Sequence, residues 1–177
     1  MKKYLKWLIP LALIVYITYY FLKEEDFGSA DFNPTDFKRY DLIIGETQLE
    51  KMDSIAQNAI SKYDFTQTKK WVHAKIIEGA DTILGSIRLK GDKIDHYHSP
   101  MLSFRLKYGK GDQKRVISLQ HPKTRRYVSE WIFHQMLKYE NLPFSDYTFA
   151  SVYINGKFKG LYAAEEHFSN PGIEKNW

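Results

Sequence analysis

The sequence has no cysteine, so disulfide bonds, thiolate catalysis and cysteine-ligated metal sites are excluded. It also lacks the H-E-x-x-H motif of zinc hydrolases and the G-x-S-x-G motif that presents a serine nucleophile. Six histidines are present, but no ligand motif accompanies them, so a metal site is disfavoured. Acidic residues are fewer than basic ones, 21 against 26, and the net charge of +5 fits either a solubilising surface or an anionic partner.

The first 26 residues differ in composition from the rest of the chain. Lysines at positions 2, 3 and 6 begin an otherwise apolar run over residues 4–22, and acidic residues follow it. As a helix this run would span roughly 28 Å, close to the ~30 Å hydrocarbon core of a bilayer. Its end lacks the small residues of a cleavage site, which favours an uncleaved signal anchor over a cleaved signal peptide. The sequence therefore predicts a single-pass membrane protein, anchored through residues 4–22, with its N-terminus cytoplasmic and its domain extracytoplasmic.

Residues 27–40 contain a glycine, an Asn-Pro pair and mixed charges, and are predicted to be a spacer before a domain at residues 41–177. Alternating apolar and polar residues, separated by turns, predict strands at 41–44, 72–77, 83–90, 102–108, 116–119, 148–154 and 158–164. The Asn155-Gly156 pair between the last two strands is a strong hairpin signal.

Two helices are predicted among these strands. Residues 47–60 have helical apolar spacing, and Thr47 with Glu50 can form a capping box. The main helix is predicted to begin near Thr124, a candidate N-cap, and to end before Pro143. Its apolar residues at three- and four-residue spacing predict a core-facing stripe: Val128, Trp131, Ile132, Met136 and Tyr139. The predicted fold class is α+β, an antiparallel sheet with one main helix.

Glu130 lies on an adjoining face of the main helix, where a carboxylate needs a cation. Phe104 and Leu106 alternate with Arg105 and Lys107 on a predicted strand, so the two basic side chains share one face. A strand cation that contacts nucleotide phosphates and is held by a helix glutamate is the plan of a protein-kinase N-terminal lobe. An ordinary salt bridge between strand and helix would give the same pattern, so spacing alone leaves both interpretations open.

The motifs and their order closely resemble those of the spore-coat CotH kinase family, an atypical protein-kinase-like group. The matching segments run in family order through residues 87–92, 95–96, 103–107, 121–125, 130–131, 133–134, 154–156, 160–162 and 165–168. Residues 98–100, His-Ser-Pro, depart from the family pattern. The resemblance covers about residues 70–177, and it implies a kinase-like N-terminal lobe.

The resemblance also implies a function. It indicates the N-terminal part of a membrane-anchored kinase that transfers the γ-phosphate of ATP, with Mg²⁺, to serine or threonine of extracytoplasmic or coat proteins. The cofactor-binding residues that it implies are Lys90, Gly91, Arg105, Lys107, Glu130, Tyr162, Glu165 and Glu166.

By the same analogy Lys90 and Gly91 lie near the loop that covers the phosphates, and Glu130 holds Arg105 against them. The segment at residues 162–166 would approach the adenine as a hinge between lobes. The catalytic and metal-binding aspartates of the family belong to a C-terminal lobe that would follow Trp177. No catalytic or metal-binding residue is therefore assigned, and nucleotide binding is the most that this chain alone is expected to perform.

The alternative function comes from a different class, a non-catalytic cell-surface binding or scaffolding module that reuses the kinase-like lobe. Nucleic-acid binding is not expected, although basic residues cluster loosely over residues 105–115, because the predicted anchor places the domain outside the cytoplasm.

Overall fold

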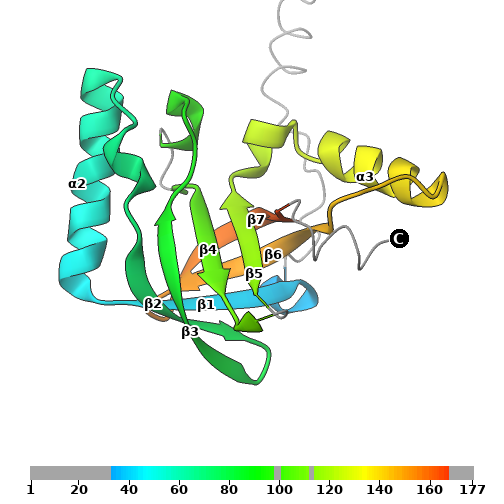
Figure 1. Ribbon diagram of the computed structural model, residues 1–177, viewed down its shortest axis with the longest axis horizontal. Coiled ribbons are helices and arrows are strands. Elements are labelled where there is room, and N and C mark those ends of the chain that lie inside the picture. The colour runs from blue at the N-terminus through cyan, green and yellow to red at the C-terminus, as the bar shows by residue number, and fades with distance from the viewer. Residues whose placement is uncertain (1–32, 98–100, 112–113, 168–177) are drawn as a thin grey trace, which may run out of the picture. The chain divides into compact units, whose positions relative to one another are not determined.

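The structure, a computed structural model, describes residues 33–97, 101–111 and 114–167. Within these residues seven strands form a closed barrel in the order β1-β2-β3-β4-β5-β7-β6 (Figure 1). The strands are β1 (Lys38–Ile44), β2 (Val72–Glu78), β3 (Asp81–Leu89), β4 (Phe104–Tyr108), β5 (Arg115–Gln120), β6 (Tyr147–Ile154) and β7 (Lys157–Glu166). Neighbouring strands are antiparallel, except that β1 and β6 pair in parallel and close the barrel.

The predicted fold, an antiparallel sheet with one main helix, is wrong, because β1 is paired along both of its edges and closes the strands into a barrel. Asp41 lies opposite Ile77 of β2 on one side and opposite Tyr153 of β6 on the other. This strand begins at Lys38, inside the predicted spacer, and is longer than the strand predicted at residues 41–44. A closed barrel leaves no free sheet edge. The described chain therefore does not form the kinase-like N-terminal lobe that the resemblance implies.

Alternate side chains of the strands point into the barrel and form the core. In β1 these are Tyr40, Leu42 and Ile44. The interior is filled by large side chains that are 2% exposed or less: Ile76, Ile87, Leu89, Phe104, Leu106, Leu119, Val152 and Tyr162. Because side chains alternate along a strand, the polar residues between them face outward.

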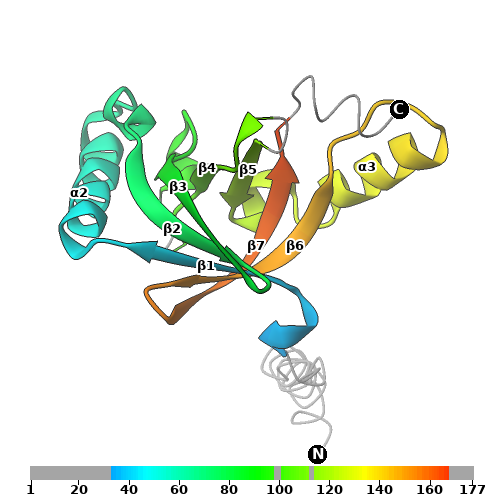
Figure 2. The ribbon, with the colours of Figure 1, turned by 60° about the horizontal axis from the view of Figure 1, so that its bottom comes forward.

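The first described α-helix, α2 (Glu46–Lys62), confirms the helix predicted at residues 47–60. It packs Met52 and Ala56 against the core of the barrel. The predicted capping box is wrong, because the N-cap residue is Gly45 rather than Thr47. Figure 2 shows α2 on one side of the barrel and α3 (Ser129–Tyr139) on the opposite side.

The start of α3 differs from the prediction. Thr124 lies in the 3-10 turn Pro122–Arg125, where its hydroxyl donates a hydrogen bond of 2.8 Å to the carbonyl oxygen of His121. Arg126 and Tyr127 then adopt positive φ angles of 52° and 58°, so the helix begins only at Ser129. Thr124 is therefore not the N-cap of the main helix.

The predicted core-facing stripe of α3 is exposed. Its residues range from 40% exposed at Trp131 to 85% exposed at Tyr139. Within α3, which the structure describes throughout, the buried residue is His134. The helix turns Glu130 and His134 towards the barrel, where both find polar partners. The apolar stripe consequently lies on the outward side, and its predicted burial was wrong.

The predicted membrane span at residues 4–22 lies outside the described residues. Among the residues that the structure does describe, no helix has both the length and the apolar character needed to cross a bilayer. The described residues therefore give no support to the predicted single-pass membrane localisation and its transmembrane helix.

Candidate anion-binding site

A row of polar side chains crosses the outer face of four adjacent strands. The register places Arg88 of β3 opposite Arg105 of β4, Arg105 opposite Ser118 of β5, and Ser118 opposite Glu165 of β7. In the next row Lys107 lies between Ser86 and Val116. These side chains face outward because Phe104 and Leu106 of β4 are buried inside the barrel. The predicted sharing of one face by Arg105 and Lys107 is confirmed.

Beside these rows the surface is hollowed into a pocket of about 530 Å³. We call it the basic pocket; the described residues that line it are Lys69, Trp71, Arg88, Arg105, Lys107, Gly111, Lys114, Val116 and His167. Two arginines and three lysines are among these residues, and no carboxylate is. The basic pocket is thus strongly positive, and it suits an anion.

The two arginines of the basic pocket are electrostatically crowded. Burial lowers the pKa of Arg88, and the neighbouring charge of Arg105 lowers it further. Burial also lowers the pKa of Arg105, although the charge of Glu165 opposes that effect. Both groups remain charged at neutral pH, since an arginine titrates far above it. A bound anion would relieve this crowding.

Hydrogen bonding leaves a buried donor of the pocket unused. The Nη1 atom of Arg88 donates to the carbonyl oxygen of Leu89 at 2.9 Å. The Nε atom of Arg105 is buried and has no hydrogen-bond partner among the described residues. A buried polar group without a partner costs free energy, so its presence in a folded protein needs a cause such as a bound ion or water.

Trp71 forms the aromatic wall of the basic pocket. The guanidinium carbon of Arg88 lies 5.2 Å from the centre of its ring system, and the Nζ atom of Lys107 lies 6.0 Å from it. These distances are typical of cation–π contacts. The indole therefore helps to place the two cations, and it adds apolar surface to a site otherwise lined largely by charges.

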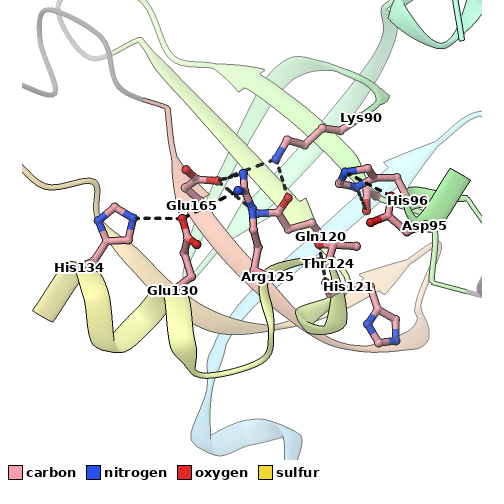
Figure 3. Close-up of polar contacts among 11 residues, drawn as sticks. Lys90, Asp95, His96, Gln120, His121, Thr124, Arg125, Glu130, His134 and Glu165 are labelled. Carbon is pink, nitrogen blue, oxygen red and sulfur yellow. Dashed lines mark hydrogen bonds and ion pairs between the residues drawn. The ribbon is translucent and has the colours of Figure 1, made fainter. Parts of the chain in front are cut away.

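A second group of polar residues lies next to the basic pocket and centres on Glu165 (Figure 3). Lys90 Nζ donates to Gln120 Oε1 at 2.6 Å, and Gln120 Nε2 donates to Glu165 Oε2 at 3.2 Å. Arg125 Nη2 donates to the same carboxylate oxygen at 3.5 Å. Lys90 Nζ is itself 3.9 Å from Glu165. Glu165 thus neutralises part of the positive charge of both Lys90 and Arg125.

Glu130 joins this group from α3. Its Oε1 atom lies 3.9 Å from Arg125 Nη1 and 3.9 Å from His134 Nε2. The other ring nitrogen of His134, Nδ1, accepts a hydrogen bond of 3.2 Å from the backbone N–H of Ser145. These contacts explain why α3 presents its polar face to the barrel.

The predicted pair of Arg105 and Glu130 is not formed among the described residues. Glu130 contacts Arg125 instead, and the carboxylate that acts on Arg105 is Glu165. Arg105 and Lys107 both line the basic pocket, whereas Lys90 belongs to the group around Glu165.

The other predicted residues lie elsewhere. Gly91, with φ of 115°, packs against the ring of His96 so closely that a side chain would collide with it. Tyr162 is buried in the core, where its ring stacks on that of Phe104 at 6.4 Å between centroids. Glu166 pairs with Arg115 at 3.3 Å, on the far side of β7 from Glu165. None of these three residues lines the basic pocket.

Sequence reasoning missed several residues of the site, notably Arg88, Trp71 and Arg125. Arg88 could have been found, because strand alternation places it on the same face as Lys90. Trp71 precedes β2, and its position beside Arg88 depends on the register of the β2–β3 hairpin, in which Val72 lies opposite Ile87.

The Mg²⁺ ion that the resemblance implies does not fit the described residues. They contain no cluster of three or more histidine, aspartate or glutamate side chains that could hold a metal ion. Mg²⁺ prefers oxygen ligands, above all carboxylates, whereas the basic pocket is lined by cations.

Comparison with known proteins identifies no relative: no family model matches the chain, and no curated protein matches it. The resemblance to the CotH kinases therefore rests on the motifs alone.

Proposed function

We propose that this protein binds a nucleoside triphosphate of the ATP class in the basic pocket, through its phosphate groups. The observation that carries the proposal is the convergence of Arg88, Arg105 and Lys107 on one pocket with an unpartnered, buried Nε atom on Arg105. Like charges held together in a partly desolvated site repel one another. A ligand with several negative charges would offset this repulsion, because it would attract each of the cations.

Guanidinium groups suit phosphate oxygens in particular. Their planar array of N–H donors can contact two oxygens at once, and such charge-assisted hydrogen bonds are stronger than neutral ones. Arg88 and Arg105 lie side by side on paired strands, so their donors can address neighbouring phosphates of one chain. The lysines at positions 69, 107 and 114 add further positive charge around them.

The size and lining of the basic pocket favour a nucleotide over a single inorganic ion. Its volume of about 530 Å³ lies within the ~300–1,000 Å³ range of small-molecule sites. Trp71 offers an aromatic surface, and a base can stack on such a surface. Phosphate recognition by the cations and stacking of a base on Trp71 are the two contacts that support this choice of ligand.

Transfer of phosphate to a protein serine or threonine, which the resemblance implies, needs more than phosphate binding. It needs a group that orients the attacking hydroxyl and metal ions that neutralise developing charge. The described residues that line the basic pocket include no carboxylate for either task. We therefore confine the proposal to nucleotide binding.

Isothermal titration calorimetry of the full chain with ATP tests the proposal. Lys107→Gln removes a pocket cation, and Lys75→Gln is the matched control, since Lys75 is an exposed lysine on β2 outside the pocket. We expect Lys107→Gln to weaken ATP binding about tenfold, corresponding to the loss of one charge-assisted contact. If the two substitutions had equal effects, ATP would be attracted by the general surface charge, and the basic pocket would be refuted as its binding site.

Titrations with AMP and tripolyphosphate separate the two parts of the ligand. Tripolyphosphate retains the phosphate charge but has no base, whereas AMP has the base and a single phosphate. We expect ATP to bind more tightly than either compound, and Trp71→Leu to abolish its advantage over tripolyphosphate. If AMP bound as tightly as ATP, the cations would not be binding the second and third phosphates, which would contradict the proposal.

A further inference from the structure

The outward side of α3 carries a continuous apolar surface that nothing in the described structure covers. Within this surface the exposed fraction ranges from 46% at Ile132 to 85% at Tyr139. We call this the α3 face; it consists of Val128, Ile132, Phe133, Met136 and Tyr139 and is extended by Tyr127 and Leu142. Large contiguous apolar patches on soluble domains usually mark sites of association.

The α3 face has the pattern of a helix-packing surface. Val128, Ile132, Met136 and Tyr139 follow one another at spacings of four and three residues, so they form one ridge along the helix. The opposite side of the helix, with Glu130 and His134, is already committed to contacts with Arg125 and Ser145. Rotation of α3 to bury the ridge would break those contacts, so the described fold leaves the ridge available to a partner molecule.

The charges at the two ends of the α3 face are complementary to each other. Exposed Lys123 and Arg126 precede the helix, and exposed Glu140 follows it. Lys138 is turned aside, with its Nζ atom 5.8 Å from the centre of the Phe144 ring. If two copies of α3 lie antiparallel, the basic end of each copy meets Glu140 of the other. The two helix dipoles then also point in opposite directions, which is electrostatically favourable.

The size of the α3 face fits an interface between two such copies. A standard protein–protein interface takes about 800 Å² from each partner, with apolar and aromatic residues at its centre. Seven large apolar side chains, each about half exposed or more, supply a surface of that order. An isologous contact also requires a patch that is complementary to itself, as the charges of this one are.

We propose that the α3 face is a dimer interface, in which two copies of this chain pack antiparallel through α3. The dimer leaves the basic pocket open, because α3 does not line that pocket. The inference is therefore independent of the proposed nucleotide binding.

Sedimentation equilibrium of the full chain provides the first test. We expect a mass of about twice the 20.9 kDa of one chain, and a return to the monomer mass in the Ile132→Glu/Met136→Glu variant. Leu84→Glu is the control, because Leu84 is an exposed apolar residue on β3. It should leave the dimer intact. All the substituted residues are exposed, so circular dichroism should show unchanged folding in every variant.

Disulfide cross-linking tests the orientation, and the absence of native cysteine makes each engineered cysteine unique. In an antiparallel pair, Val128→Cys and Tyr139→Cys should each fail to cross-link alone and should cross-link when the two variants are mixed. Residues 128 and 139 lie roughly 16 Å apart along one helix, so copies of the same residue are too distant for a disulfide, which needs Cα atoms within about 7 Å. Gln57→Cys on α2 should not cross-link with either.

Three results would overturn the proposal. A monomeric mass at all concentrations would show that the α3 face does not pair with a second copy of the chain. A dimer that survives the Ile132→Glu/Met136→Glu change would place the interface elsewhere. Cross-linking of Val128→Cys with itself, without reaction in the mixture, would show a parallel arrangement.

Discussion

Lys90 and Gln120 form a buried pair on the outer face of the barrel, with the Nζ atom of the lysine 2.6 Å from the Oε1 atom of the amide. Gln120 in turn donates to Glu165, so its orientation is fixed from both ends. A lysine that loses this acceptor would keep a buried charge with one contact fewer. A glutamine that loses the lysine would keep a buried oxygen without its partner.

A double-mutant cycle should reveal this dependence. We expect Gln120→Leu to lower the free energy of unfolding by roughly 1–3 kcal/mol, and Lys90→Met to lower it by less, because that change also removes a buried charge. The double variant should lose less than the sum, by about 1 kcal/mol or more, because neither group is then left unpaired. Urea denaturation measures all three. Lys90→Met combined with Gln57→Leu, an exposed change on α2, should be additive; additivity in both cycles would contradict a specific pair.

Lys90 should also make the stability of the fold depend on alkaline pH. Burial lowers its pKa to about 8 from an ordinary 10.5, although Glu165 favours its charged form. Between these two values the unfolded chain binds more protons than the folded one, so the free energy of unfolding rises with pH. We expect a gain of roughly 1–2 kcal/mol between pH 7.5 and pH 9.5. Urea titrations should show that gain in the native protein and not in Lys90→Met.

Local features of the fold could be predicted from the sequence because they depend on neighbouring residues. Asn155 and Gly156 adopt positive φ angles of 48° and 77°, as the hairpin signal requires. Closure of the barrel is a different matter. It requires β1 to pair with β6, and the side-chain amide of Asn155 adds two contacts there: it accepts from the backbone N–H of Ile44 and donates to its carbonyl oxygen, both at 2.9 Å. A contact between such distant segments leaves no periodic pattern in the sequence.

The candidate site, too, could be predicted only where it depends on local sequence patterns. Strand alternation placed Arg105 and Lys107 together correctly, since it needs only the period of two. The partner of Glu130 could not be found in this way, because Arg125 reaches it from a 3-10 turn whose path depends on the left-handed conformations of Arg126 and Tyr127. Likewise, helical spacing identified an apolar side of α3, but it carries no information on whether that side meets the core or another molecule.

Acid should destabilise the fold through Glu78. Burial raises its pKa, but hydrogen bonds from Lys38, Tyr108 and Arg115 outweigh burial and lower it from 4.5 to about 2. The folded-state value lies below the unfolded one, so the contribution is complete above about pH 4.5 and is lost as the pH falls towards 2.

The contribution of Glu78 can be measured against a matched substitution. At pH 7 Glu78→Gln should lower the free energy of unfolding by roughly 2–3 kcal/mol, and the deficit should shrink as the pH falls from 5 to 2. Glu50→Gln, on the exposed side of α2, should have little effect at any pH. A deficit for Glu78→Gln that is constant across this range would show that the carboxylate charge is not its cause.

Arg105 should lower the stability of the fold, although it contributes to ligand binding in the basic pocket. Its buried Nε atom has no partner among the described residues, and it stands opposite the like charge of Arg88. We expect Arg105→Met to raise the free energy of unfolding by about 0.5–1.5 kcal/mol without ligand, since the burial of this charge outweighs its attraction to Glu165 and replacing such a charge at a binding site commonly stabilises a protein. The same change should weaken ATP binding about tenfold or more.

Thermal unfolding with and without ATP measures both effects in one experiment. Ligand that binds only the folded state raises the melting temperature of the native protein. Arg105→Met should start from a higher melting temperature and gain less from ATP. Arg88→Met is the comparison, because Arg88 already donates to the carbonyl oxygen of Leu89 and its loss should bring a smaller increase in stability or a decrease. If Arg105→Met were less stable than the native protein without ATP, its guanidinium would be a structural group, and the principal support for a phosphate site in this pocket would be lost.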